Sequence, residues 1–517
     1  MVWKKFRHNG VAFPKPYEVK RVLLKIKGKK IEMNSETEEM AHTWVKKIGT
    51  PYVEDPVFIS NFLKDFTKKI MYKNEVESIN EIDFSNFNKI LERERKDKEN
   101  KDLKKKLSEK RKIEREKLKD EFGYAEVDDQ NYEISNWMVE PPGLFMGRGK
   151  HPLRGRWKPR TRENEVTLNL DQKAKVPEGG WGKIVHDTES MWIAKWKDQL
   201  TNKVKYVWLS DSSTIKQDRE KRKYDLARKL GKNIFRVREQ IKIDLKSEDV
   251  KIRKIAMICY FIDKLAMRVG DEKDSNEADT VGASTLRVEH IKVSGEGITF
   301  DFLGKDSVRW ERTFKLKDKE IKETIKNFLD GKEDHQQVFD GVNSKSVNKY
   351  LSGIMEGLSA KVFRTYIATT VVKKYLQSID VSNGLEMEKR FHIKMANLEA
   401  AKICNHKRAI PKNWDEKLVI KKEKLKILRK TEVKTEKQTL KLEERINKLK
   451  IDIKFTEESR DHNLGTSLKN YIDPRVCVVW AKDIGLDWEK IYTKTLQRKF
   501  LWASKTDLTW KNIIVKF

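Results

Sequence analysis

The sequence predicts an α+β protein of several domains, and three observations support this. The chain has 517 residues, too many for one ordinary hydrophobic core, so two to four domains are expected. Charged residues make up 37% and hydrophobic residues 38% of the chain, which leaves enough apolar mass to fold. Strand-like patterns occur in the first two hundred residues, with many Trp residues from about residue 165 onward, and helical patterns dominate the chain after residue 212.

Residues 1–212 are predicted to form a mixed α/β region. A short strand-like run covers Val22–Ile26, and residues 165–212 alternate apolar and polar side chains, which predicts antiparallel strands. Residues 86–122 contain no Gly or Pro and are almost wholly charged, which predicts a helical arm. That arm is typical of a solvated helical hairpin, and the alternative is a basic arm that lies near nucleic acid.

A basic run follows in residues 147–162, which hold seven Arg or Lys residues and no acid. Glycines within it allow a close approach of the backbone to a ligand. Arg side chains together with backbone N–H groups position phosphates. The run therefore predicts phosphate contacts, with a disordered basic loop as the alternative. The six candidates for these contacts are Arg148, Lys150, Arg154, Arg156, Lys158 and Arg160.

The remaining residues are predicted to be mainly helical. Residues 213–410 form a central domain with one strand pair, near residues 298–302 and 308–310, and Lys305 lies on the tip between them. Residues 411–456 carry leucines and isoleucines at alternating steps of three and four, which predicts an antiparallel coiled coil. Residues 457–517 are predicted to form a small helical C-terminal domain that carries Tyr471.

The net charge of +31 indicates a polyanionic partner, and nucleic acid is the leading candidate. The alternative is a basic structural protein. The three cysteines are far apart in the sequence and form no CxxC pair, so neither a disulfide framework nor a zinc site is expected. We expect no secretory signal and no membrane span, because the chain begins with polar residues and the longest apolar run near Tyr471 has six residues.

One set of residue types suits phosphodiester chemistry without metal or ATP. A tyrosine is a poor nucleophile at neutral pH, since its pKa is about 10, but fixed cations around a phosphate can make it useful. Basic clusters upstream of the tyrosine could supply those cations. The candidate catalytic residues are Arg268, Lys305, Arg364, His406 and Tyr471.

Several strings carry a family resemblance. They include Glu140–Phe145, Tyr260–Ala266, Asp301–Ser307 and the segment around Tyr471, in family order from about residue 10 to residue 517. The chain resembles the eukaryotic-type DNA topoisomerase I, a type IB enzyme. The resemblance implies a multidomain clamp: an N-terminal DNA-binding cap, a helical catalytic core, a coiled-coil linker and a C-terminal domain. The implied partner is double-stranded DNA, and the chain is expected to act as a monomer without a cofactor or metal.

The resemblance also implies roles for individual residues. Tyr471 would attack the phosphodiester and form a 3′-phosphotyrosyl bond, so that religation needs no ATP. Arg268 and Arg364 would grip the non-bridging oxygens, and His406 would donate a hydrogen bond to them. Lys305 would protonate the departing 5′ oxygen. Further contacts with DNA are expected from Lys216, Lys273, Thr280, Asp306, Thr466 and Asn470.

Two other functions remain open. A tyrosine recombinase uses nearly the same residues, although it lacks such an N-terminal half. A non-catalytic basic DNA-binding scaffold is the second alternative. No G-x-x-x-x-G-K-[ST] string occurs, so a P-loop ATPase is not supported. The usual long charged N-terminal tail of the family is missing from this sequence, so we expect either a nuclear protein or one that works at a viral or cytoplasmic replication site.

Overall fold

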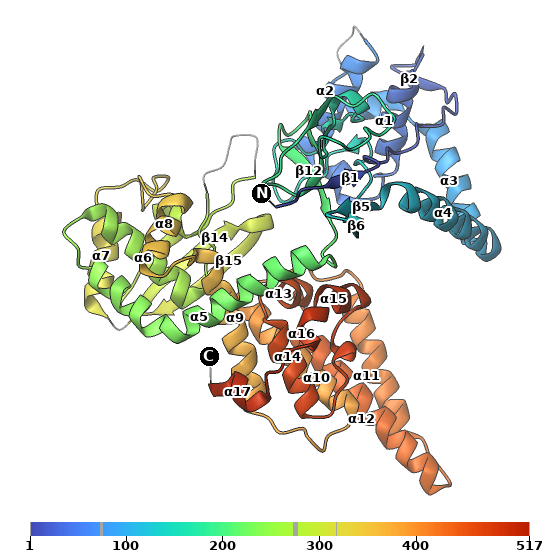
Figure 1. Cartoon of the computed structure of the whole chain (residues 1–517). Coiled ribbons are helices and arrows are strands. Elements are labelled where there is room, and N and C mark those ends of the chain that lie inside the picture. Colours follow the sequence, from blue (N-terminus) through green and yellow to red (C-terminus); the bar gives the residue numbers. More distant parts are fainter. Residues whose placement is uncertain (1, 73–75, 272–277, 317, 516–517) are drawn as a thin grey trace. The chain divides into compact units, whose positions relative to one another are not determined.

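The computed structural model describes residues 2–72, 76–271, 278–316 and 318–515. The chain divides into two compact units: unit 1 comprises residues 1–216 and 273–279, and unit 2 comprises residues 217–272 and 280–517. The division falls inside one long helix, α5 (Thr214–Asp244). Each unit is described by itself. Figure 1 labels the elements along the chain.

Unit 1 contains a small α/β layer near its start. Its three strands lie in the order β3–β2–β4, and the helices α1 and α2 begin at side-chain caps, Asn34 and Asp55, which accept hydrogen bonds from backbone N–H groups of the first turns. Aromatic side chains fill its core, where Trp44 and Phe62 stack with ring centroids 4.3 Å apart. The elements are β2 (Leu24–Ile26), β3 (Lys29–Ile31), α1 (Ser35–Val45), α2 (Pro56–Lys69) and β4 (Ile82–Asp83).

A seven-stranded sheet with its own apolar core forms a second part of unit 1. A two-stranded antiparallel sheet, β7 (Gly143–Leu144) and β8 (Trp157–Lys158), also belongs to this unit. One expectation for this sheet was wrong: residues 165–212 are not all antiparallel, because β9 and β10 pair in parallel. The long connection over residues 170–182 returns the chain to the starting end of β9, as a parallel pair requires. The strands, in sheet order, are β1 (Phe6–His8), β5 (Tyr124–Val127), β6 (Gln130–Ser135), β12 (Val204–Leu209), β11 (Trp192–Lys197), β9 (Thr167–Asn169) and β10 (Lys183–Val185).

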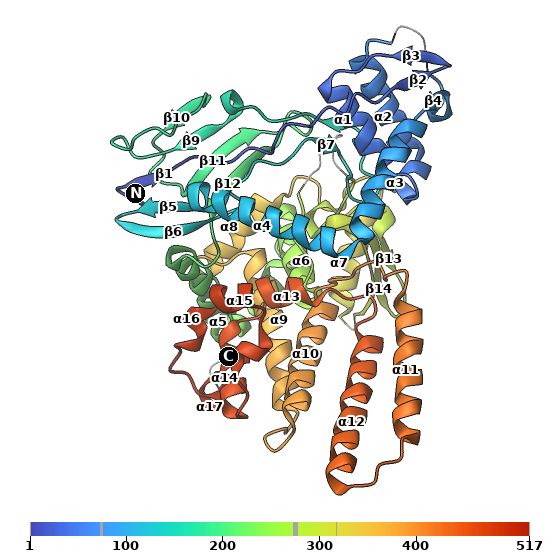
Figure 2. The ribbon, with the colours of Figure 1, turned by 90° about the vertical axis from the view of Figure 1, so that its right-hand side faces the viewer.

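The charged arm is helical, as predicted, but it is not a hairpin. It consists of α3 (Ser85–Glu99) and α4 (Lys101–Phe122), which meet at an angle (Figure 2). Only Asn100 separates them, in an extended conformation that caps α4, and one residue is too short to reverse the chain. Ile113 is 54% exposed, whereas Leu118 packs against the core of the seven-stranded sheet. The arm is therefore solvated over most of its length.

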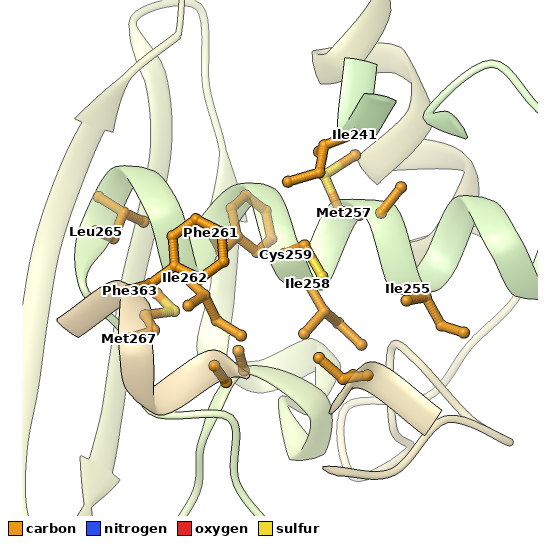
Figure 3. Close-up of a cluster of buried hydrophobic side chains, with 14 of the residues drawn as sticks. Ile241, Ile255, Met257, Ile258, Cys259, Phe261, Ile262, Leu265, Met267 and Phe363 are labelled. Atoms are coloured by element: carbon orange, nitrogen blue, oxygen red, sulfur yellow. The ribbon is translucent and has the colours of Figure 1, made fainter. Parts of the chain in front are cut away.

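The first core of unit 2 surrounds α6 (Val250–Leu265), whose apolar side chains are buried (Figure 3). Ile258, Phe261 and Ile262 of this helix share one core cluster with Ile241 of α5 and Phe363 of α9. A three-stranded antiparallel sheet, ordered β13–β14–β15, completes this core. The elements are β13 (Ile291–Val293), β14 (Gly297–Gly304), β15 (Val308–Lys315), α7 (Lys319–Leu329), α8 (Ser344–Ile354) and α9 (Ala360–Gln377).

A second apolar cluster joins α9 and α10 to the C-terminal helices. Beside α10 the helices α11 and α12 pack as an antiparallel pair (Figure 2), joined by residues 431–435. Salt bridges tie them, including Lys421 Nζ to Asp452 Oδ2 at 2.6 Å. The helices are α10 (Glu386–Ile403), α11 (Trp414–Lys430), α12 (Glu436–Glu458), α13 (Leu464–Asn470), α14 (Pro474–Asp483), α15 (Lys494–Lys499), α16 (Leu501–Ser504) and α17 (Trp510–Val515).

Two further features concern chemistry and partners. Cys259, Cys404 and Cys477 are free and buried in unit 2, and burial raises the pKa of each thiol. In the described part of the chain, no helix is long and apolar enough to cross a membrane.

Candidate active site

Arg364, on the second turn of α9, is the buried centre of the candidate site. It is 3% exposed. Its Nη1 donates to the carbonyl oxygen of Ala266, and its Nη2 donates to the carbonyl oxygen of Cys404 at 3.1 Å. Ala266 ends α6 in a left-handed conformation, with φ of 51°, and Cys404 follows the last turn of α10. The ends of two helices therefore fix the position of this guanidinium.

Arg268 lies two residues beyond the end of α6 and interacts electrostatically with Arg364. Burial and the charge of Arg364 lower the pKa of Arg268. Within the residues that the structure describes, neither guanidinium has a carboxylate partner within 4 Å, and the Nε of Arg364 is buried without a hydrogen-bond partner. The charge of Asp306 acts on Arg268 less than that of Arg364 does, and two close cations without an ion-paired acid form a site that an anion would stabilise.

Tyr471 lies directly against this pair. The Cζ of Arg364 is 4.9 Å from the centroid of the Tyr471 ring. Burial alone would raise the pKa of Tyr471, but the charges of Arg364 and Arg268 outweigh burial and hold that pKa below its ordinary value of 10. The two arginines thus favour the phenolate, which is the nucleophilic form of the side chain.

His406 stacks on the tyrosine next to Arg364. The ring centroids of His406 and Tyr471 lie 5.4 Å apart with an interplanar angle of 29°. Burial, followed by the charges of Arg364 and Arg268, lowers the pKa of His406 to about 3, so its imidazole is neutral at physiological pH. Its Nε2 lies 3.3 Å from Nη2 of Arg364, and its buried Nδ1 has no partner among the described residues.

Lys305 comes to the site from the β14–β15 hairpin. It lies on the tip of that hairpin, as the sequence predicted, and the next two residues, Asp306 and Ser307, have φ values of 68° and 57°. One small pocket is lined by Arg268, Lys305 and Arg364 together. The structure thus brings the three predicted cations to one place. The Lys305 side chain is exposed, whereas Arg364 is buried.

The segment that carries Tyr471 is held by a residue that the sequence analysis missed. Thr369, on α9, donates its hydroxyl to the carbonyl oxygen of Tyr471 at 3.2 Å and accepts the backbone N–H of Asp473 at 3.0 Å. Asp473 in turn pairs with the buried Arg475, whose Nη1 reaches Asp225 of α5 at 2.7 Å. Thr369 follows Arg364 by five residues. A polar side chain on the apolar part of α9 was the signal in the sequence that could have identified it.

The other predicted contact residues of unit 2 lie near this site or at its edge. Thr466 and Asn470 belong to α13, and Asn470 Nδ2 donates to the Thr466 carbonyl at 3.1 Å. Thr280 precedes Val281, whose N–H donates to Leu303 of β14 at 2.7 Å. Asp306 is exposed beside Lys305. These four residues lie on or beside elements that also carry candidate catalytic residues.

Two predicted contacts lie elsewhere in the chain. Lys216, in the first turn of α5, pairs with Asp211 at 3.6 Å. Lys273 lies outside the described residues. The structure therefore places Lys216 in unit 1, with an acidic neighbour of its own.

Most of the predicted basic run in unit 1 is engaged within that unit. Arg154 is held by Asp55 at the start of α2, with Nη2 to Oδ1 at 2.9 Å, and Arg156 donates to Asp65 at 2.7 Å. Lys158 pairs with Asp198 at 3.2 Å and also with Glu140, and Arg160 donates to the Pro14 carbonyl at 2.7 Å. Arg148 and Lys150 are exposed. The sequence showed the cations but not the distant acids that pair with them.

Comparisons with known protein families agree with this arrangement. Residues 1–209 match the family described as "Eukaryotic DNA topoisomerase I, DNA binding fragment". Residues 212–440 match "Eukaryotic DNA topoisomerase I, catalytic core", and residues 443–512 match "C-terminal topoisomerase domain". Together these three matches run along nearly the whole chain.

Individual relatives give the same result. The chain is 36% identical to DNA topoisomerase 1 of Drosophila melanogaster, 35% identical to DNA topoisomerase 1 of Homo sapiens and 37% identical to DNA topoisomerase 1 beta of Arabidopsis thaliana. The alignments cover 97%, 97% and 98% of this chain, but only 54%, 70% and 59% of these relatives. The chain thus spans between about half and about seven tenths of the length of these relatives.

Proposed function

This chain belongs to the eukaryotic DNA topoisomerase I family, the type IB DNA topoisomerases, and we propose that it relaxes supercoiled DNA by cutting and resealing one strand. Tyr471 is the nucleophile. Its oxygen attacks the phosphorus, the bond from phosphorus to the 5′ oxygen breaks, and the DNA 3′ end remains attached to the tyrosine. The 5′ oxygen takes a proton from Lys305. Religation reverses these steps, and because the phosphotyrosyl ester retains the energy of the broken bond, it needs no ATP.

The cations stabilise the charge that develops on the non-bridging oxygens. Arg268 supplies its guanidinium to those oxygens, and Arg364 supplies its charge and its unpartnered Nε–H. His406 donates a hydrogen bond to the same oxygens from Nε2, in the tautomer that carries its proton there, when the phosphate takes the place of Nε2 beside Arg364. The single observation that carries the proposal is the pair of guanidiniums without carboxylate partners, one of them 4.9 Å from the Tyr471 ring.

The parts of the chain have separate tasks in this proposal. Residues 1–212 form a cap that encloses duplex DNA, and residues 213–410 form the catalytic core. Residues 411–456 form a coiled-coil linker, which is supported by the partial or full burial of Leu418, Leu425, Leu428, Leu449 and Ile453 between mostly exposed charged residues. Residues 457–517 form the domain that carries the nucleophile.

DNA contacts beyond the catalytic centre are proposed in both units. In unit 1 they come from Arg148, Lys150 and Lys216, with the ion-paired Arg154, Arg156, Lys158 and Arg160 shaping the loop and adding to its positive field. In unit 2 they come from Thr280, Asp306, Thr466 and Asn470. The chain acts as a monomer in the nucleus. The match of residues 1–209 to a DNA-binding fragment favours this function over a recombinase.

The test is relaxation of a supercoiled plasmid in EDTA without ATP. We expect the wild-type chain to relax the plasmid and to leave a covalent protein–DNA adduct when detergent stops the reaction. Tyr471→Phe should lose both activities and retain DNA binding, because only the phenol oxygen takes part in bond making. A covalent adduct in the Phe variant would assign the nucleophile to another residue, and relaxation that depends on added metal or ATP would exclude this mechanism.

A further inference from the structure

One unassigned hollow of unit 2 lies between α10 and the paired helices α11 and α12, away from the catalytic residues. Its volume is about 540 Å³, which is in the range of small-molecule sites. Its floor is apolar and comes from all three helices, with Phe391 on α10, Leu428 on α11, and Leu449 and Phe455 on α12. Phe391 and Leu428 are each 8% exposed. The hollow therefore has a formed apolar floor.

The rim of this hollow is strongly cationic. Lys424 of α11 and Arg445 and Lys448 of α12 line it, and in the described part of the chain no carboxylate lies within salt-bridge distance of any of the three. The one acid in the lining, Asp452, is paired with Lys421 at 2.6 Å. The hollow thus combines an apolar floor with cations that lack counter-charges.

Two more cations stand on the α10 side. Arg390 is paired only weakly with Glu386, at 3.7 Å, and the Nζ of Lys394 lies 5.4 Å from the centroid of the Phe455 ring. The chain places acids elsewhere on these helices, as at Glu457, which pairs with Lys422 at 2.6 Å. The excess of positive charge is therefore local to the hollow, which is the electrostatic complement of an anion.

We propose that this hollow binds a small amphiphilic anion, with an apolar body of two or three rings on the Phe391–Leu449 floor and a carboxylate or sulfonate against Lys424 and Lys448. Duplex DNA is a poorer fit, because its phosphates could reach the rim but nothing on its surface would cover the apolar floor. Since the walls belong to different helices, an occupant would bridge α10 to the α11–α12 pair.

The test uses 8-anilinonaphthalene-1-sulfonate as the probe on the full chain. Its neutral relative, N-phenyl-1-naphthylamine, has the same rings without the sulfonate, and inorganic sulfate has the charge without the rings. We expect saturable binding of one sulfonate probe, at least about tenfold tighter than either comparison compound. Methyl NMR signals of Met387, Leu428, Leu449 and Ile451 should shift on addition of the probe.

Charge reversal on α12 separates this site from general attraction to a basic protein. Lys448→Glu should weaken probe binding by about tenfold. Lys441→Glu makes the same change in net charge seven residues earlier on the same face of α12 and outside the hollow, so it should change binding by less than about twofold. Equal effects of the two variants, equal affinity for the neutral relative, or unshifted methyl signals would each overturn the proposal. If a variant fails to fold, the affinities of the three probes for the wild-type chain still test the proposed site.

Discussion

At the residue scale, the site depends on a few hydrogen bonds between residues that are far apart in the sequence. The backbone oxygens of Ala266 and Cys404 hold Arg364, and the hydroxyl of Thr369 holds the Tyr471 segment from two sides. Each contact joins α9 to a segment that is distant in the sequence. The position of the proposed nucleophile is therefore set by groups with no reactive chemistry of their own.

Thr369→Val should test this positioning role. The variant keeps the shape of the side chain but loses both hydrogen bonds, which should cost about 1–3 kcal/mol because the Asp473 N–H is left unsatisfied. The rate of single-turnover cleavage should fall while DNA affinity stays unchanged, and Thr369→Ser should restore the rate. If Thr369→Val lowers thermal stability but cleaves at the wild-type rate, Thr369 is structural only.

The pH dependence of stability has a residue-scale source in unit 1. Burial lowers the pKa of His8 to about 4 and outweighs the hydrogen bond between its Nε2 and the Asn169 carbonyl, at 2.9 Å, which favours the protonated form. Its Nδ1 accepts the Gly10 N–H at 3.0 Å. Between pH 6.5 and pH 4 the histidine is protonated in the unfolded chain, where its pKa is near 6.5, but not in the folded one. The free energy of unfolding therefore falls as the pH drops from about 6.5 towards 4.

Between pH 7 and pH 5 this histidine should cost about 2 kcal/mol of stability. His8→Asn keeps an acceptor for the Gly10 N–H and removes the titrating group. On acidification, the variant should therefore lose less protection from hydrogen exchange than the wild type. Hydrogen exchange of the β1 amides at both pH values measures this difference. An identical acid response in wild type and variant would show that His8 does not titrate in this range.

At the element scale, the β14–β15 hairpin delivers the proposed general acid. Lys305→Ala should slow cleavage of ordinary DNA strongly, since the 5′ oxygen would leave without a proton. A substrate with a bridging sulfur at that 5′ position has a leaving group that needs no proton, so it should be cleaved by the variant at nearly the wild-type rate. Single-turnover rates on the two substrates measure the effect, and equal impairment on both would reduce Lys305 to a binding role.

The hairpin also shows what the sequence could predict and what it could not. The alternation on both sides of Gly304 was enough to place Lys305 at a tip. The charged run between residues 86 and 122 was enough to predict helix, but not the bend at Asn100. The partners of Arg364 and Arg154 come from segments about 100 residues away in sequence, and no local pattern records such pairs. The parallel pairing of β9 with β10, whose partners are 16 residues apart, was missed because alternation predicts a strand but not the direction of its neighbour.

At the scale of the whole molecule, the net charge of +31 should make DNA affinity fall steeply with salt. The structure refines which charges matter. Lys150 is exposed, whereas Arg154 is tied to Asp55. Lys150→Gln should reduce the slope of log affinity against log salt by about 0.9 if it touches one phosphate.

Arg154→Gln provides the comparison. It should leave that slope nearly unchanged but should destabilise unit 1, because Asp55 loses its partner at the start of α2. Filter-binding titrations at several salt concentrations and thermal unfolding separate the two effects. A larger change of slope in Arg154→Gln than in Lys150→Gln would mean that the loop releases its internal ion pairs when it binds DNA.

The distribution of cysteines has a practical consequence for following motion in this protein. All three thiols lie in unit 2, buried and with raised pKa values, and unit 1 contains none. The native cysteines should therefore react little with thiol-reactive dyes. One cysteine introduced at an exposed position of the α3–α4 arm, and one at the far end of the α11–α12 pair, would give a donor and an acceptor for single-molecule fluorescence. The proposed closure of the enzyme around DNA could then be tested without removing a single native residue from its core.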